Sequence, residues 1–397
     1  MLQNFIYDIP TKVLFGPNQL SRLAPELSVY GKKVLLVYGG SSIKKIGLYD
    51  RVMAELTQGG FDVCELSGVE PNPRISSVRA GAAICKEHGV DIVLAVGGGS
   101  VIDAAKWIAA SACVEHDPWD FFVKMNQTPV EKALPIATIL TLAATGSEMD
   151  AIGVISNLDS KDKYGRGAAP YLYPRVSFLD PTLTYTVGAY QTACGSADIL
   201  SHVLETYFNV HEDESFYMLD CFMEGLMKSV IKYAPIALAQ PDNYEARANL
   251  MWASSWAING FIRKPQPWSC HPMEHELSAQ YDITHGLGLA ILTPRWMEYC
   301  LDDRTLPKYV QFGKNVFGIC GDMSDMEIAR QAIEATKKFL YQSLGLTDTL
   351  TKLNITDEHF GHMAAKVAHG RDGTAECLNG MKPLYQEDVE AIYRMCL

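Results

Sequence analysis

The sequence predicts an α/β domain built on a mostly parallel sheet, followed by an all-α domain. In the first half, short apolar runs alternate with stretches of helical periodicity, which is the pattern of a doubly wound sheet. After Asp180-Pro181, β-branched runs become rare and amphipathic periodicity continues to the end. A chain of 397 residues is long enough for two domains with full hydrophobic cores. We therefore predict domains at residues 1–185 and 186–397.

Strands are expected where an apolar run ends at turn-forming residues. Such runs occupy 33–38, 61–66, 91–96, 135–141 and 176–179. Helical stretches lie between them, at 43–56, from the turn at 71–74 to Cys85, and from the glycines at 97–99 to about Cys113. The opening segment from Phe5 to Phe15 alternates weakly, which is typical of an edge strand or a hairpin. In the second half, helices are expected at 218–234, 244–259, 328–343 and 388–395.

Composition excludes several classes of protein. Apolar residues make up 48% and charged residues 20% of the chain, as in ordinary folded proteins. A net charge of −12 argues against nucleic-acid and anionic-membrane partners. The chain shows neither a secretion signal nor an apolar run long enough to span a bilayer. Its ten cysteines form no Cys-x-x-Cys pair and are expected to be reduced thiols, which fits a cytoplasmic protein.

Glycines and hydroxyls follow two of the expected strands. Gly97-Gly98-Gly99-Ser100 lies between a strand and a helix, where glycine permits close backbone approach to a pyrophosphate and the helix start attracts anions. Asp103 follows in the first turn and is expected to cap the helix. The segment 141–148 has hydroxyls and a glycine after another strand, where open α/β sheets bind ligands. Neither segment matches Gly-x-Gly-x-x-Gly or a Walker loop, and a purely structural turn is an equally good explanation of a triple glycine alone.

The loop after the first long strand bears on the choice of dinucleotide. NAD sites usually place a carboxylate there for the ribose 2′-hydroxyl, but this loop reads Gly39-Gly40-Ser41-Ser42, with two lysines close behind. A 2′-phosphate would meet no repulsion, so the sequence favours NADP(H) over NAD(H).

Four residues in the second half have the chemistry of a metal site. Asp198 and His202 are four apart in a predicted helix, so they share one face. His271 and His285 follow about seventy residues later. Three imidazoles and a carboxylate suit a divalent metal of the zinc or ferrous type, although spacing alone fits core histidines equally well. The remaining histidines are interpreted as core or surface residues: His88, His116, His211, His359, His362 and His369.

The surroundings of His271 leave alternatives open. His271 is expected at the entry of a helix that Pro272 begins. His275 then lies one turn further, as a proton-relay group, a further metal neighbour or a structural residue, and the relay is favoured. Glu274 and Glu276 are expected in solvent or behind the ligands. His271-Pro-Met-Glu274-His275 also matches the inverted zinc-peptidase pattern, but that function leaves the glycine-rich half unexplained.

Taken together, these motifs resemble the iron-containing alcohol dehydrogenase family, particularly its NADPH-dependent butanol dehydrogenase/aldehyde reductase branch. The resemblance runs over nearly the whole chain, through the segments 10–16, 70–73, 97–103, 144–148, 179–181, 198–205 and 271–286. The chain departs from the family where Glu274 replaces the usual Gly or Ala, Ser278 replaces Gly, and Thr284 replaces the Pro before the last histidine.

The resemblance implies roles for individual residues. As metal ligands, for iron or zinc, it implies Asp198, His202, His271 and His285, with His275 close to the nicotinamide. For the pyrophosphate loop it implies Gly97, Gly98, Ser100 and Asp103. Further cofactor contacts are implied at Thr141, Thr145, Lys163, Leu179, Leu183 and Tyr185. The small-residue loop of the NADP-using branch corresponds to Gly39, Gly40 and Ser41.

The function expected from these features is interconversion of aldehydes and primary alcohols by hydride transfer, with NADP(H) and one divalent metal, in a homodimer. Two rival functions remain. A metal-dependent lyase of the dehydroquinate synthase type would require more basic residues than the segment 271–285 provides. The zinc peptidase would act without a nicotinamide.

Overall fold

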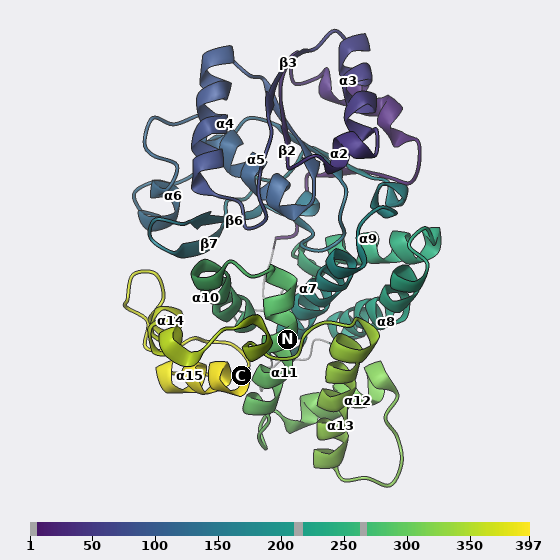
Figure 1. Cartoon of the computed structure of the whole chain (residues 1–397), viewed down its shortest axis with the longest axis vertical. Helices are drawn as coiled ribbons and strands as arrows, with labels where there is room; N and C mark the ends of the chain where they lie inside the picture. Colours follow the sequence, from purple (N-terminus) through teal and green to yellow (C-terminus); the bar gives the residue numbers. More distant parts are fainter. Residues whose placement is uncertain (1–5, 210–216, 263–267) are drawn as a thin grey trace. The chain divides into compact units, whose positions relative to one another are not determined.

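The computed structural model describes residues 6–209, 217–262 and 268–397, which divide into two compact units (Figure 1). The sheet unit comprises Asp8–Val187 and Pro241–Asn259, and the helical unit comprises Gly188–Gln240 and Gly260–Leu397 together with Ile6 and Tyr7. The predicted fold class is confirmed, with a parallel sheet in the N-terminal part and helices in the C-terminal part. The domain limits 1–185 and 186–397 stay a prediction, and the compact units do not follow a single cut. His211 lies outside the described residues.

In the described part of the chain, six parallel strands form the main sheet, in the order β1-β8-β5-β4-β2-β3. Their bounds are β1 Lys12–Phe15, β2 Lys33–Tyr38, β3 Asp62–Leu66, β4 Ile92–Gly97, β5 Ile136–Leu140 and β8 Val176–Leu179. Each of the five strands expected from apolar runs is present. The opening segment supplies the edge strand β1, parallel to β8; Phe5, where we placed its start, lies outside the described residues.

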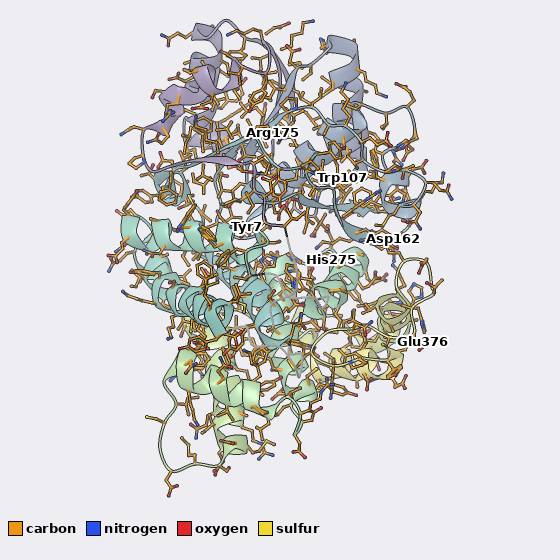
Figure 2. The ribbon with its side chains drawn as sticks, turned by 180° about the vertical axis from the view of Figure 1, so that it is seen from behind. Tyr7, Trp107, Asp162, Arg175, His275 and Glu376 are labelled. Atoms are coloured by element: carbon orange, nitrogen blue, oxygen red, sulfur yellow. The ribbon has the colours of Figure 1, made fainter. Side chains whose placement is uncertain are left out.

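Both faces of this sheet are covered, which explains why its strands are continuous apolar runs. In β2, Leu35 and Val37 belong to one buried core, whereas Val34 and Leu36 belong to another, because side chains alternate between the faces of a strand. The first core also contains Trp107, which is fully buried (Figure 2). Helices therefore pack on both sides of the sheet, and its ligand-binding groups must lie at the strand ends.

The helices of the sheet unit are α1 Leu23–Leu27, α2 Ser42–Lys45, α3 Leu48–Gln58, α4 Ile75–His88, α5 Gly99–Ser111, α6 Asp120–Val123 and α9 Tyr244–Ile258. The single helix expected at 43–56 is wrong: Gly47, at φ +68°, separates α2 from α3. We also did not expect the antiparallel hairpin of β6 Ile152–Asn157 and β7 Asp162–Gly167. Its strands are partly polar, and Trp107 on α5 donates a hydrogen bond to the Gly153 carbonyl at 3.0 Å, so tertiary contacts hold the hairpin.

The helical unit contains α7 Ala189–Phe208, α8 Tyr217–Ala239, α10 Cys270–Tyr281, α11 His285–Cys300, α12 Leu306–Phe317, α13 Asp325–Lys337, α14 Phe360–His369 and α15 Gln386–Met395. The helix expected at 328–343 consists of α13 and a π-helical continuation, Lys338–Ser343. Among the described residues, none of the helices combines the length and apolar character that a bilayer span requires.

A buried carboxyl in the sheet unit gives a pH-dependent prediction. Glu148 accepts a hydrogen bond from Ser255 at 2.5 Å, while its Oε2 has no hydrogen-bond partner among the described residues. Burial raises the pKa of Glu148 from 4.5 to about 7. The folded chain therefore holds this proton more tightly than the unfolded chain, and the free energy of unfolding decreases as the pH rises through this window.

We therefore expect Glu148→Gln to gain stability relative to the parent protein as the pH rises from about 5 to about 8, by roughly 1–3 kcal/mol. Urea unfolding of both proteins at the two pH values measures the change, and the acidic measurement serves as the internal control. A difference between the proteins that is the same at both pH values would contradict the assignment.

Candidate metal centre and nucleotide loops

Helix α7 carries the first two residues of the candidate metal centre. Asp198 and His202 lie one turn apart on α7, and both side chains are almost completely buried. A turn of 3.6 residues places positions four apart on the same face. The sequence expectation that these two side chains point in one direction is therefore met, and their burial removes them from competing water.

Helices α10 and α11 carry the histidines His271 and His285. His271 lies in the first turn of α10, which begins at Cys270, so our expectation that the helix begins at Pro272 is wrong. Proline fits here because the first N–H groups of a helix have no intrahelical acceptor in any case. Helix α10 ends at Tyr281, its C-cap Asp282 is in the left-handed conformation at φ +52°, and His285 is the first residue of α11. A tight turn thus brings the start of α11 back beside α10.

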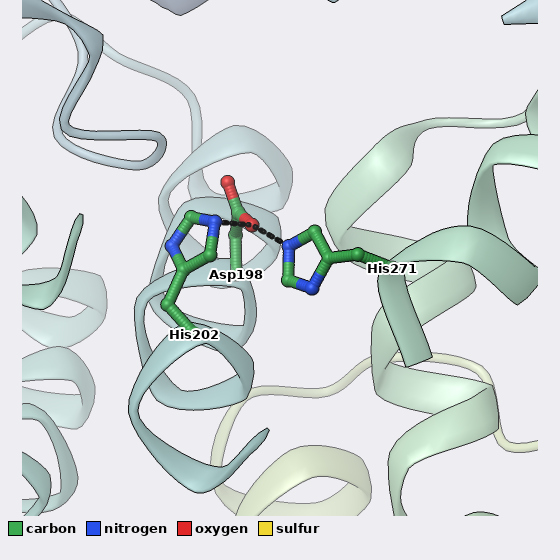
Figure 3. A group of neighbouring side chains, drawn as sticks. All are labelled: Asp198, His202 and His271. Carbon is green, nitrogen blue, oxygen red and sulfur yellow. Dashed lines mark ion pairs between the residues drawn. The ribbon is translucent and has the colours of Figure 1, made fainter. Parts of the chain in front are cut away.

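Three of the predicted ligands, Asp198, His202 and His271, have ligand atoms that all lie within 4.8 Å of one another, and His285 approaches the same Asp198 oxygen. Oδ1 of Asp198 lies 3.5 Å from Nε2 of His202, 3.6 Å from Nε2 of His271 and 3.7 Å from Nε2 of His285. Figure 3 shows the rings of His202 and His271 turned toward the Asp198 carboxylate. Within the described part of the chain, neither Asp198 Oδ1 nor His271 Nε2 has a hydrogen-bond partner.

The separations between the Asp198 oxygen and the three histidine nitrogens match those of ligand pairs around a divalent cation. Metal–ligand bonds of about 2.1 Å to nitrogen and oxygen put neighbouring tetrahedral ligands roughly 3.4 Å apart. Buried polar atoms without a partner are costly, and a cation bonded to all four atoms would remove that cost. The donor set of three nitrogens and one oxygen matches zinc or ferrous iron in type, so the residues present fit the metal.

The local charges also favour a cation. Burial lowers the pKa of His202 to about 4, so this ring is neutral and offers a lone pair. Burial also opposes a charge on His271, but Glu205 and Asp198 outweigh it and raise its pKa to about 9. Burial likewise disfavours ionised Asp198, yet the three histidines hold its pKa far below the usual range. The carboxylates around these rings thus require a positive charge among them, which a proton or a metal ion supplies.

Two carboxylates lie behind the histidines. Nδ1 of His271 pairs with Oε1 of Glu205, and Nδ1 of His285 pairs with Oε2 of Glu274. Glu205 Oε2 also accepts the backbone N–H groups of Ser269 and Cys270, at 2.7 and 2.6 Å. Glu205 has a role that we did not predict from the sequence, although its spacing of three from His202 places it on the same side of α7. Glu274 was expected either in solvent or behind the ligands, and the structure places it behind the ligand His285.

Two aromatic rings lie beside the centre. The Trp268 ring centroid is 5.2 Å from that of His202 and 4.7 Å from that of His271, so its apolar surface shields both imidazoles. We did not predict this role of Trp268 from the sequence. His275, one turn along α10 from His271, is half-buried in the helical unit (Figure 2), with its ring centroid 5.6 Å from that of His285. Since Glu274 is engaged with His285, it is not available as the general base that the inverted zinc-peptidase pattern requires.

In the sheet unit, the glycine-rich loops follow adjacent strand ends. From β2 the chain proceeds to β3 on one side, whereas β4 lies on the other side of β2 and leads on to β5. This reversal of strand order is a topological switch point, where open α/β sheets bind ligands beyond the carboxyl ends of the strands. Tyr38 pairs with Val96 in register, so the loop at 39–41 and the loop at 97–100 begin side by side. Thr141 joins them through a 3.0 Å hydrogen bond from its N–H to the Gly97 carbonyl.

Close packing explains the glycine at the start of α5. A Cβ at Gly99 would lie 2.2 Å from Oγ1 of Thr145, so the threonine side chain occupies the space that glycine leaves.

Asp103 does not cap α5, and that expectation is wrong. Its two carboxylate oxygens instead accept hydrogen bonds from Ser147 Oγ at 2.6 Å and from the Val154 N–H at 3.0 Å, so both are engaged by groups outside the helix. Asp103 therefore ties α5 to the hairpin beneath the loop.

The remaining predicted cofactor contacts all lie in the sheet unit. Gly98 is the N-cap of α5, and Ser100 follows in its first turn. Lys163 is buried on β7, and Leu179 is buried as the last residue of β8. Leu183 and Tyr185, within and just after the 3₁₀ turn Pro181–Thr184, are half-buried. Gly39 is half-buried, while Gly40 and Ser41 are exposed. Their roles toward a nucleotide stay predictions.

Known proteins match the chain over its full length. The model of the iron-containing alcohol dehydrogenase family matches residues 10–181, and that of the C-terminal region of the Fe-containing alcohol dehydrogenase family matches 192–397. NADH-dependent butanol dehydrogenase A of Clostridium acetobutylicum is 50% identical over 98% of this chain and 99% of its own. NADPH-dependent aldehyde reductase YqhD of Escherichia coli is 37% identical over 88% of this chain and 89% of its own.

A solved structure agrees in fold. The crystal structure of NADH-dependent butanol dehydrogenase A from Thermotoga maritima has a TM-score of 0.92 and 38% identity, covering 99% of this chain and 98% of that one. Two family models, close relatives and a matching fold lead to one conclusion. The chain belongs to the iron-containing alcohol dehydrogenase family and is an oxidoreductase of the alcohol dehydrogenase type that uses a nicotinamide nucleotide and a divalent metal.

Proposed function

We propose that this enzyme reduces aldehydes to primary alcohols, and catalyses the reverse reaction, with NADP(H) and a metal held by Asp198, His202, His271 and His285. The observation that carries the proposal is the convergence of three imidazole nitrogens within 3.5–3.7 Å of one buried carboxylate oxygen. Four protein ligands of this type suit a metal that also accepts a substrate oxygen.

The chain's own residues prepare the reaction in two places. When bound, the metal acts as a Lewis acid on the carbonyl oxygen, and the reduced nicotinamide supplies hydride to the carbonyl carbon. Glu205 accepts the Nδ1 proton of His271, which leaves Nε2 as the ligand atom. In the sheet unit, the first N–H groups of α5 offer hydrogen bonds and a positive dipole end to the pyrophosphate. Trp268 covers the rings of His202 and His271 and keeps water from them.

We assign proton delivery to His275. Reduction of a carbonyl requires a proton at the oxygen after hydride reaches the carbon. His275 is half-buried, and its ring lies near that of His285, which suits transfer between water and the site. Histidine also changes charge near neutral pH, as a proton-transfer group must.

The loop after β2 supports a preference for NADP(H). Between Gly39 and Ser42 it has no carboxylate, and Lys44 lies just beyond, with Nζ 4.6 Å from the centre of the Tyr49 ring. The names of the relatives do not decide the preference, because the Clostridium protein is called NADH-dependent and the Escherichia coli protein NADPH-dependent.

Gly40→Asp is expected to shift the cofactor preference toward NADH. A Cβ at Gly40 meets nothing within 4 Å, whereas one at Gly39 would lie 3.1 Å from the Val69 carbonyl oxygen, so Gly40 accepts the change with less strain. Like charges about 8 Å apart repel by roughly 2 kcal/mol at an effective dielectric of ~20, so the ratio of kcat/KM for NADPH to NADH should fall more than about tenfold. Gly40→Asn is the uncharged control. An unchanged ratio in Gly40→Asp would show that the 2′-phosphate is held elsewhere.

The reaction is tested by following NADPH absorbance with a panel of short aldehydes. Consumption of NADPH that depends on aldehyde supports the proposal. A lyase of the dehydroquinate synthase type reduces and reoxidises its nicotinamide within one turnover, so it would show no net consumption. A zinc peptidase would cleave peptides without the nucleotide. The panel also identifies the preferred chain length.

Metal content is tested on protein purified without added metal. Family members carry iron or zinc, and three nitrogens with one oxygen suit both, so elemental analysis identifies the metal.

We also propose a cytoplasmic homodimer. The strand β1 pairs on one side with β8 and, among the described residues, has no strand on the other, and an edge of this kind can pair with a second copy. Light scattering after size-exclusion chromatography measures the mass, and a monomer would overturn that part of the proposal.

A further inference from the structure

The ligand His285 is held differently from the others. Its side chain is 22% exposed, against 3% for Asp198 and His202 and 6% for His271. It also begins a helix, directly after the turn that ends α10. A partly exposed residue at a helix end has more freedom than one inside a buried helix. Something other than burial must therefore hold its ring in the geometry that a metal requires.

Glu274 is placed to hold this ring. It is fully buried on α10, and its Oε2 pairs with Nδ1 of His285. Its other oxygen, Oε1, accepts a hydrogen bond from the Ser278 hydroxyl, one turn along the same helix. Ser278 Oγ also lies 3.2 Å from the Ile283 carbonyl oxygen, in the turn that leads to His285. Ser278 thus holds one oxygen of the Glu274 carboxylate, and the other oxygen holds the imidazole of His285.

The packing of α11 leaves room for this carboxylate. A Cβ at Gly288, one turn after His285, would lie 2.8 Å from Cγ and 3.0 Å from Oε1 of Glu274. Glycine at this position therefore allows the buried glutamate to reach Nδ1. His202 offers a contrast, because its Nδ1 has no hydrogen-bond partner among the described residues and its fixation comes from burial inside α7.

We propose that Glu274 and Ser278 are positioning residues for His285, and that they slow the loss of the metal from the centre. With Nδ1–H donated to Glu274, the lone pair of His285 is confined to Nε2, which faces Asp198 Oδ1 at 3.7 Å. The negative charge of Glu274 also makes the imidazole a stronger donor. This inference rests on the proposed metal centre.

The test measures how fast a chelator removes Zn²⁺ from loaded enzyme. Glu274→Ala is expected to lose the metal about 10–100-fold faster than the parent enzyme, because removing a group that orients a metal-binding histidine typically lowers metal affinity by about 10–100-fold. Glu274→Gln is the conservative variant, because its amide oxygen still accepts the Nδ1 proton, and it should restore most of the retention. Ser278→Ala should accelerate loss less than Glu274→Ala. In the double variant, Ser278→Ala should add little, since it acts through Glu274.

Glu276→Gln is the matched control. Glu276 is also a buried glutamate on α10, but it pairs with Lys366 at 2.8 Å, so its replacement should leave metal release unchanged. Equal acceleration in Glu276→Gln and Glu274→Ala would attribute the effect to damage of α10 and overturn the inference. Parent-like release from Glu274→Ala would also overturn it. If Glu274→Ala does not fold, Ser278→Ala and Glu274→Gln decide: release from Ser278→Ala equal to the parent rate overturns the inference. A parent enzyme that binds no metal would instead refute the proposed function itself.

Discussion

Asp198→Ala is expected to abolish both metal binding and turnover. Asp198 supplies an oxygen that lies 3.5–3.7 Å from Nε2 of all three histidines, and it is the only carboxylate among the proposed ligands. Loss of metal removes Lewis-acid stabilisation worth several kcal/mol, so kcat/KM should fall by about 10³-fold or more. His271→Ala should have the same result, because it removes a ligand and leaves Glu205 buried without its ring partner. Elemental analysis and aldehyde-dependent NADPH oxidation measure the two effects.

Two further variants make this prediction specific. Asp198→Asn keeps the shape of the side chain but not its charge, so it should retain the fold while binding the metal weakly. His362 is exposed on α14, and His362→Ala should change neither metal content nor activity. Full activity or full metal content in Asp198→Ala would refute the ligand assignment.

Gly286→Ala is expected to disturb the metal centre through the backbone. A Cβ at Gly286 would lie 2.1 Å from the carbonyl oxygen of Cys194 and 2.6 Å from its carbonyl carbon. Cys194 is one turn before Asp198 on α7, and Gly286 follows His285 on α11. Because the clash is with main-chain atoms, the helices must separate, and this carries His285 away from Asp198. We expect a loss of roughly 1–3 kcal/mol in the free energy of unfolding.

Activity should fall further than stability suggests, since a displacement of about 1 Å at a catalytic centre costs on the order of 100-fold. Urea unfolding, metal content and kcat/KM measure these effects. Gly225→Ala is the matched control: Gly225 is exposed on α8, and a Cβ there meets nothing within 4 Å. It should raise the free energy of unfolding by about 0.5–1 kcal/mol. If Gly286→Ala also stabilised the protein and kept its metal, the close contact between α11 and α7 at Gly286 would not be what positions His285.

The apolar pattern of each short segment was sufficient to predict the strands of the main sheet. Strands such as β2 and β8 are continuous apolar runs because helices cover both faces of the sheet, and such runs are visible without any knowledge of the fold. The pairing of Asp198 with His202 was equally accessible, because a helix turn fixes which residues share a face. The hairpin β6–β7 was not, since its strands lack a clear alternation and depend on α5 for support.

The sequence by itself determined which elements form and which residues have metal-binding and phosphate-binding chemistry, because helix and strand periods and side-chain chemistry are local properties. Only the tertiary structure decided how those residues meet. Glu274 is one of two buried glutamates on α10, and nothing in its local sequence distinguishes it from Glu276. The return of α11 places His285 against Glu274, whereas the position of α14 places Lys366 against Glu276. The physical reason is that contacts between helices depend on the path of the chain through space, which no short segment specifies.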